Sequence, residues 1–378
     1  MNLLFYLLVF LLVLIVSSTT NKLLPFLPMP LIQILLGIGI GLCLPNNQYH
    51  LDTELFLALV IGPLLFREAQ EADITSILKH WRIVLYLIFP VIFISALSMG
   101  GVAHVLWASL PLAACVAVGA ALGPTDLVAF ASLSQRFSFP KRVSNILKGE
   151  GLLNDASGLV AFRMALIAWT TGTFSLTQAG TSLAISIVGG FAVGCITALI
   201  NRFLHTFLLS VRATDIASEL LLELSLPLLT FFIAEEIHVS GIIAVVVAGI
   251  LKASRFKKIN LLEAQVDTVT ETVWNTVTFM LNGSVFVVLG MELEMIAEPI
   301  LKSAFYNNVL LLVTIFLLTF LLFAIRFVMI YGFYAFRIKK LHKSLDKYVK
   351  DMLLLTFSGV KGTVSIATIL LIPSNLEQ

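Results

Sequence analysis

The sequence predicts an all-α polytopic membrane protein, built as one membrane domain over residues 1–378 with about twelve transmembrane helices. The first reason is composition. Apolar residues make up 59% of the chain, charged residues 12%, and the mean hydropathy is +1.01, whereas soluble domains are about 45–50% apolar and about 25% charged. The second reason is that apolar residues gather in runs long enough to cross a bilayer. The third is that basic residues fall in alternate loops between those runs.

A helix that crosses the hydrocarbon core needs about 20 mostly apolar residues. Twelve such runs follow one another: about 2–18, 28–44, 54–68, 77–99, 103–135, 141–170, 178–203, 214–236, 239–253, 264–292, 304–336 and 348–373. The eighth run carries Glu219 and Glu223, and the ninth is short, so these two fit the pattern least well. The first run has no preceding Lys or Arg and is long for the apolar part of a signal peptide. It therefore predicts a membrane span.

Basic residues set the orientation, because cytoplasmic loops carry an excess of Lys and Arg. One alternate set of loops holds 19 of the 24 basic residues: Lys22, Arg67, Lys79, Arg82, Arg136, Lys141, Arg142, Arg202, Arg212, Lys252, Arg255, Lys257, Lys258, Arg337, Lys339, Lys340, Lys343, Lys347 and Lys350. The opposite loops hold only Lys302. We therefore expect cytoplasmic basic loops, with the N-terminus and Gln378 outside a plasma or inner membrane. The dispersed basic residues give no indication of nucleic-acid binding.

Two predicted spans are interrupted. The fifth contains "GPTD" at 123–126, and the twelfth contains "SGVKGT" at 358–363. Proline and glycine weaken a helix, and unwound backbone at membrane depth is tolerated only where protein or a cavity satisfies it. Spans five and twelve cross in opposite directions, as an inverted repeat requires, and paired broken spans indicate a transporter binding site. The alternative is two unrelated kinks.

Few charges lie at membrane depth, where each costs at least about 2.5–3.5 kcal/mol and is a candidate for function. At 1.5 Å per residue, Asp155 falls at the centre of the sixth span and Lys361 at the middle of the twelfth. Asp126 lies near the centre of the fifth. Glu150 and Arg326 share a level on the cytoplasmic side, which predicts an ion pair.

Two carboxylates at one depth, Asp155 and Asp126, beside unwound backbone carbonyls, predict an all-oxygen metal site for a small hard cation. Desolvation and a like-charged neighbour raise the pKa of a carboxyl group, so a proton could compete for the same site. Purely structural interpretations of these residues stay open. The Glu150–Arg326 pair could be a structural clamp, Asp155 a satisfied acceptor, and Asn154 a brace at a helix crossing.

Five segments carry a resemblance to a known family. They are "GPTDLVAFASL" (123–133), "RVSNILKGEGLLNDASGLVAFRMAL" (142–166), "LFREAQEAD" (65–73), "VFVVLGMEL" (285–293) and "SGVKGTVSIA" (358–367). Taken in chain order, they resemble the sodium/proton exchanger family of the monovalent cation/proton antiporter-1 type, most closely its bacterial NhaP-like branch. The Asn–Asp pair after "GEGLL" is the most specific element.

The resemblance implies thirteen spans in two inverted repeats, crossed broken helices five and twelve, and a homodimer. Here repeat one would cover about 1–171, a linker helix about 178–203, and repeat two about 214–378. It implies electroneutral exchange of Na⁺, or K⁺ or Li⁺, for H⁺, without a cofactor. A thirteenth span is missing from the predicted set, so a truncated, transport-inactive antiporter or regulator is an alternative. An intramembrane aspartyl protease is a further alternative function.

By position, the resemblance makes Asp155 the main cation- and proton-binding carboxylate. Asp126 and the backbone of Thr125 match its partners, and Asn154 matches the residue that steadies the broken helix. Glu150 and Arg326 match the buried ion pair. Three positions depart from the family pattern: Leu127 stands where Pro is common, Gly151 where Ser is common, and Lys361 where Arg is frequent.

Overall fold

The computed structural model describes residues 3–43, 53–126, 130, 134, 137–172, 176–211, 215–253, 261–302, 308–341 and 348–359. Every regular element in these ranges is a helix. The elements are α1 (Leu3–Leu23), α2 (Met29–Cys43), α3 (Thr53–Phe56), η1 (Leu57–Ile61), α4 (Gly62–Glu71), α5 (Ile74–Lys79), α6 (Trp81–Tyr86), η2 (Leu87–Val91), α7 (Ile92–Leu106), α8 (Leu112–Ala121), α10 (Lys141–Thr171), α11 (Leu176–Ser210), α12 (Ile216–Glu236), α13 (Gly241–Ala253), α14 (Leu261–Lys302), α15 (Asn308–Leu341) and α16 (Val349–Phe357). The predicted all-α polytopic fold is confirmed.

Six helices in the described ranges are long and apolar enough to cross a membrane: Trp81–Leu106, Lys141–Thr171, Gly180–Leu208, Ile216–Glu236, Thr268–Leu293 and Leu312–Arg337. Four shorter apolar helices accompany them: Leu8–Leu23, Met29–Cys43, Leu112–Ala121 and Gly241–Ala253. The eighth and ninth predicted runs, the least regular in sequence, are both helical. The ninth is short because α13 is a core helix, in which every residue from 241 to 249 is buried.

The predicted boundary between the fourth and fifth spans, at residues 99–103, was wrong. Helix α7 continues through Gly100 to Leu106, and Pro111 starts α8. Gly100 stays helical because it lies directly against α8: a Cβ there would be 2.6 Å from the Cα of Val116. Small residues allow such close helix packing in membranes.

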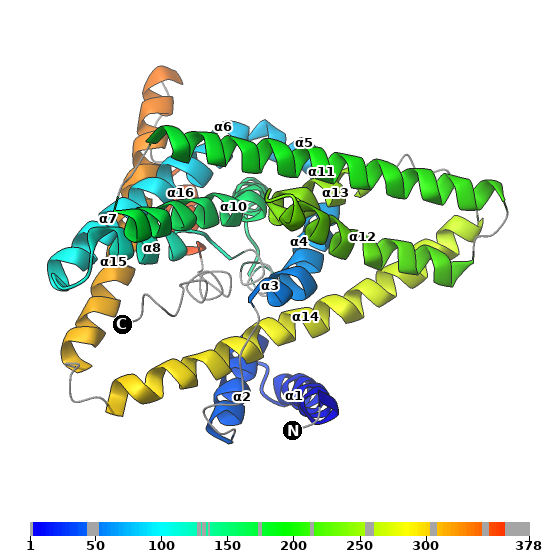
Figure 1. Ribbon diagram of the computed structural model, residues 1–378, viewed down its shortest axis with the longest axis horizontal. Helices are drawn as coiled ribbons and strands as arrows, with labels where there is room; N and C mark the ends of the chain where they lie inside the picture. The colour runs from blue at the N-terminus through cyan, green and yellow to red at the C-terminus, as the bar shows by residue number, and fades with distance from the viewer. Residues whose placement is uncertain are drawn as a thin grey trace.

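The helices gather in two bundles (Figure 1). The α13 bundle contains α1, α2, α4, α11, α12, α13 and α14, and the α10 bundle contains α6, α7, α8, α10, α15 and α16. Helix α10 joins them, because it also contacts α4 and α13. In Figure 1, α11 and α14 run along the length of the molecule, α1 and α2 lie on the outer side of α14, and α15 stands at the left-hand end.

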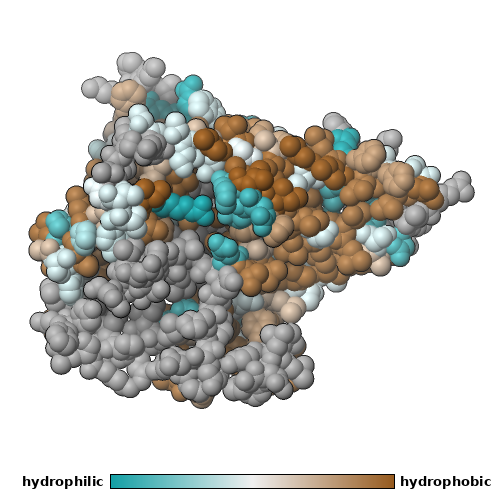
Figure 2. Space-filling view, viewed as in Figure 1, coloured by the Kyte–Doolittle hydropathy of each residue, from teal (hydrophilic) through white to brown (hydrophobic). Residues whose placement is uncertain are grey.

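Large apolar side chains cover the outside of the long helices. On α11 they include Ile185, Val188 and Phe203, which are 62%, 67% and 69% exposed. Figure 2 shows hydrophobic side chains spread over the elongated part of the molecule formed by α11 and α12. A surface of this kind would be a liability in water, but it suits contact with lipid tails.

Two segments are π-helical and were not predicted from the sequence. Segment η1 precedes Pro63, and η2 contains Pro90. Proline removes a backbone donor and displaces the preceding turn, which a π-bulge accommodates by inserting one residue into the ladder. The second segment lies against α10, the helix that carries most of the predicted site.

Candidate ion-binding site

The unwound segment after α8 lies against the middle of α10. Helix α8 ends at Ala121, and Thr125 and Asp126 follow in non-helical backbone, 5% and 8% exposed. The side-chain amide of Asn154 on α10 donates to the backbone oxygen of Thr125 at 2.8 Å and to its Oγ1 at 2.6 Å. A carbonyl that the broken helix cannot satisfy is therefore satisfied by α10.

Asn154 also brings an acceptor into this region. Its side chain is fully buried, and its Oδ1 has no hydrogen-bond partner among the described residues. Buried amide oxygens are nearly always hydrogen-bonded or bound to an ion. An amide oxygen of this kind fits the donor set of a hard cation.

The fit between α10 and the break is close because of Gly158. A Cβ at this position would overlap the ring of Pro124. Asn154 and Gly158 are four residues apart and share one face of the helix. This face of α10 therefore touches the break at two points, Thr125 and Pro124.

Glu150, one turn before Asn154, pairs with Arg326 of α15. The two guanidinium nitrogens Nη1 and Nη2 each donate to one carboxylate oxygen at 2.7 Å. The Arg326 and Glu150 side chains are 4% and 1% exposed. A two-pronged arginine–carboxylate pair of this geometry is strong and directional. The pair occupies both carboxylate oxygens of Glu150.

Arg326 also holds the end of α16. Its Nε donates to the backbone oxygen of Leu355 at 3.0 Å, in the last turn of that helix. Gly359 packs on the guanidinium: a Cβ there would lie 2.7 Å from Arg326 Nε and 3.1 Å from Thr125 Cγ2. The end of α16 and the break after α8 therefore meet beside the ion pair. The rest of the second predicted break, residues 360–363, lies outside the described residues.

A second contact between α10 and α15 lies eight residues before Glu150 on α10 and eight residues after Arg326 on α15. The guanidinium carbon of Arg142 lies 5.5 Å from the ring centre of Tyr334 and 5.0 Å from that of Tyr348. Arg142 also approaches Asp351 at 3.6 Å. Cation–π contacts of this kind keep the antiparallel helices in the register that brings Glu150 to Arg326.

Some predicted site residues lie outside the described set. The backbone of Asp155 lies within α10, but its side chain is not among those described, and Leu127 and Lys361 are also outside. The structure thus brings together Thr125, Asp126 and Asn154 on one side and Glu150 and Arg326 on the other. That the Asp155 side chain faces Asp126 stays a prediction.

A polar cluster in the α13 bundle was not assigned a role from the sequence. Glu223 accepts from Gln70 Nε2 at 2.6 Å and pairs with Lys252 Nζ at 2.8 Å. Lys252 donates in turn to Asn201 Oδ1 at 3.0 Å. The cluster ties α4, α11, α12 and α13 together, so Glu223 is part of a tight helix contact. The only sequence signal was the spacing of Glu219 and Glu223.

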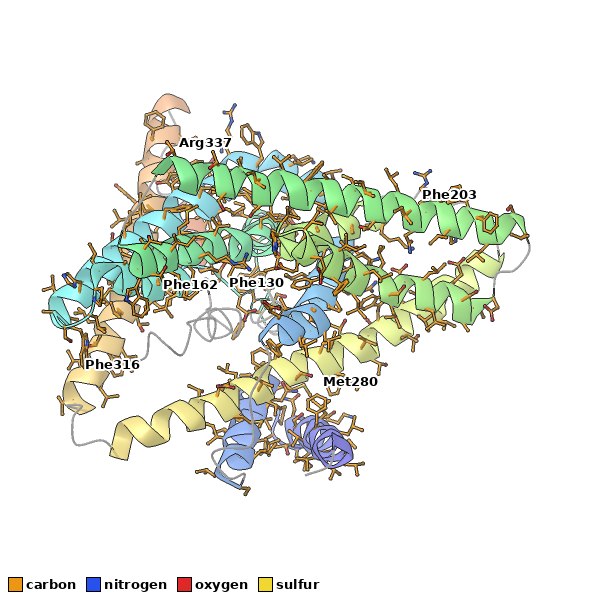
Figure 3. All side chains as sticks on the ribbon, in the orientation of Figure 1. Phe130, Phe162, Phe203, Met280, Phe316 and Arg337 are labelled. Carbon is orange, nitrogen blue, oxygen red and sulfur yellow. The ribbon has the colours of Figure 1, made fainter. Side chains whose placement is uncertain are left out.

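The described residues contain no group of three or more His, Cys, Asp or Glu side chains that could hold a metal ion. Figure 3 shows how the interior and the surface differ. Phe162 on α10 and Phe130 lie in the middle of the molecule, 0% and 3% exposed, whereas Phe203 and Phe316 point outward from α11 and α15. Phe162 lies on the same helix as Asn154 and Glu150 and therefore belongs to the buried interior beside them.

Secondary transporters are known in which unwound helix segments place backbone groups at a binding site. Sequence comparison names the family: the model described as "Sodium/hydrogen exchanger, transmembrane" matches residues 7–377. The chain belongs to the sodium/hydrogen exchanger family.

Named antiporters from two Bacillus species are similar in sequence to this chain. The chain is 35% identical over 362 residues to the sodium, potassium, lithium and rubidium/H⁺ antiporter of Bacillus pumilus, covering 95% of this chain and 54% of that protein. The antiporter of the same name from Bacillus subtilis is 35% identical over 380 residues, with 100% and 57% covered. This chain therefore spans little more than half the length of these relatives.

A solved structure shows the same fold. The sodium proton antiporter MjNhaP1 from Methanocaldococcus jannaschii aligns with a TM-score of 0.69 and 18% identity, covering 98% of this chain and 86% of that one.

Proposed function

We propose that the chain exchanges a monovalent cation for H⁺ across the membrane by alternating access. The observation that carries the proposal is the contact of Asn154 with the broken helix. Its amide nitrogen binds Thr125, its Oδ1 has no partner among the described residues, and the next residue on α10 is Asp155. Oxygen ligands of this kind suit Na⁺, K⁺, Li⁺ or Rb⁺, the cations for which the Bacillus relatives are named.

In this proposal Asp155 is the carboxylate that binds the cation on one side of the membrane and a proton on the other. Asp126, Thr125 and Asn154 complete the site with carboxylate, backbone and amide oxygens. Glu150 takes no cation, because Arg326 already binds both of its carboxylate oxygens. One carboxylate that trades one positive charge for another moves no net charge, so the exchange is electroneutral.

Alternating access requires the site to open to each side in turn. The α10 bundle carries the site, and α10 meets the α13 bundle through α4 and α13. We propose that the α10 bundle moves relative to the α13 bundle, with the basic loops in the cytoplasm and the N-terminus outside a plasma or inner membrane. We also propose that the chain assembles as a homodimer. Its physiological role in this proposal is sodium and pH homeostasis.

The experiment is cation-driven dissipation of a pH gradient in everted vesicles that contain the chain. Na⁺, K⁺, Li⁺ and Rb⁺ are added in turn across a range of pH, with choline as the control cation and vesicles without the chain as the background. The proposal expects dissipation by at least one alkali cation, with no current in voltage-clamped proteoliposomes. Inserted, folded chain without exchange of any of the four would support a transport-inactive regulator instead.

A further inference from the structure

The π-helical segment η2 lies against the site helix. Pro90 falls inside it, and at its end the N–H of Ile92 donates to the backbone oxygen of Phe89. In a regular α-helix that N–H would donate to Ile88, four residues back. Bulges of this type are frequent at functional sites because they redirect backbone groups. Here the carbonyl of Ile88 is the one that the N–H of Ile92 does not bind.

The hydroxyl of Ser157 on α10 reaches this carbonyl. Its Oγ lies 2.9 Å from the backbone oxygen of Ile88 and 2.8 Å from that of Asn154. Ser157 is 2% exposed. A hydroxyl has one proton to donate, and within a helix the usual acceptor is the carbonyl of the preceding turn. Both oxygens lie within hydrogen-bonding distance, and a bond to Ile88 links α10 to η2, whereas a bond to Asn154 stays within α10.

Ser157 belongs to the same face of α10 as the residues that touch the broken helix. Asn154 precedes it by three positions and binds Thr125, and Gly158 follows it and lies against Pro124. This face is thus held between two irregular backbone segments, the η2 bulge and the break after α8. Rotation of α10 about its axis would move Asn154 away from Thr125.

We propose that Ser157 is a positioning residue for the cation site, and that it sets the rotation of α10 by hydrogen bonding to the carbonyl that the η2 bulge presents. The inference rests on the proposed exchange function. Ser157 does not bind the cation in this account. It acts through Asn154, which it holds in line with Thr125.

The first variant is Ser157→Ala, assayed as cation-dependent exchange in proteoliposomes. One hydrogen bond contributes roughly 1 kcal/mol, so we expect the apparent KM for the cation to rise about fivefold. The maximal rate per folded molecule should change less, because Asp155 and the ion pair are untouched. Ser17→Ala is the matched control: its buried hydroxyl donates to the backbone oxygen of Leu14 in α1, away from the α10 bundle.

The second variant is Pro90→Ala, which restores a backbone N–H and allows η2 to become a regular helix. The Ile88 carbonyl would then turn back into its own helix, so Pro90→Ala should raise the KM in the same direction. The double variant should be no worse than the more severe single variant, since both remove one contact. Two residues that act independently would instead show additive effects.

Purified protein provides a readout that does not depend on transport rate. Thermal stabilisation by Na⁺, titrated for each variant, should shift to higher Na⁺ for Ser157→Ala and Pro90→Ala, and not for Ser17→Ala. Folded Ser157→Ala protein with an unchanged KM, or additive effects in the double variant, would overturn the inference. Wild-type protein without exchange would overturn the proposed function itself, so the two failures are distinguishable.

Discussion

Removal of the Arg326 side chain is the perturbation whose cost follows most directly from the structure. Arg326→Ala leaves the Glu150 carboxylate buried with 1% of its side chain exposed and without its two hydrogen-bond donors. Breaking a buried ion pair by removing one partner costs about 3–5 kcal/mol. The hydrogen bond from Nε to Leu355 is lost as well. Stabilities of domains are about 5–15 kcal/mol, so this loss is a large fraction of the total.

We therefore expect Arg326→Ala to lower the yield of folded protein and the thermal stability in detergent, and to change the apparent cation affinity much less. The assays are thermal unfolding of purified protein and the KM of the folded fraction. Arg163→Ala is the control, because Arg163 and its partner Glu235, 3.8 Å apart, have side chains that are 53% and 37% exposed. Such exposed pairs contribute about 0.2–1 kcal/mol.

A double variant separates the effect of the unpaired charge on stability from the effect of the lost side-chain volume. Replacing both partners, Glu150→Leu with Arg326→Met, removes the unpaired charge and should recover much of the stability, because apolar replacements of a whole buried pair are often neutral or stabilising. The reasoning is refuted if Arg326→Ala keeps wild-type stability and loses cation affinity. Arg326 would then act in transport and not as a clamp.

Two further predictions concern helix contacts. Gly158→Val should abolish exchange in inserted protein, because the added side chain would overlap Pro124. Gly39→Val is the control and should exchange as wild type, because a Cβ there meets nothing within 4 Å. Equal loss of exchange in both variants would contradict the packing argument. Glu223→Gln should lower thermal stability by leaving the Lys252 ammonium, paired at 2.8 Å, without a counter-charge. Adding Lys252→Met should restore part of that stability, and no recovery would show that Glu223 acts through other contacts.

Much of the fold could be predicted because the bilayer imposes it. Span length follows from hydrocarbon thickness. The direction of each span, inferred from Lys and Arg in the loops, stays a prediction. Depth along a span even predicted the Glu150–Arg326 pair, since a rise of 1.5 Å per residue placed both at one level. These predictions rest on distances along the membrane normal, which the sequence encodes directly.

Contacts around the helix axes could not be predicted in the same way. The acids at Glu219 and Glu223 were visible, but their partners come from helices far apart in sequence, such as Lys252 on α13. The bulge at η2 had only Pro90 as a signal, and a proline can equally kink a helix or end it. The length of α14, 42 residues, exceeds any bilayer requirement, and its apolar run did not predict where the helix ends.

The central claim is that Asp155 on α10 alternates between a cation and a proton. The most direct test is Na⁺-driven dissipation of a pH gradient by purified Asp155→Asn protein in proteoliposomes. Asp73→Asn serves as the matched control, because Asp73 caps α5 at the surface and Asn caps a helix equally well. The account predicts no exchange by Asp155→Asn and wild-type exchange by Asp73→Asn. Exchange by Asp155→Asn at the wild-type rate would contradict it.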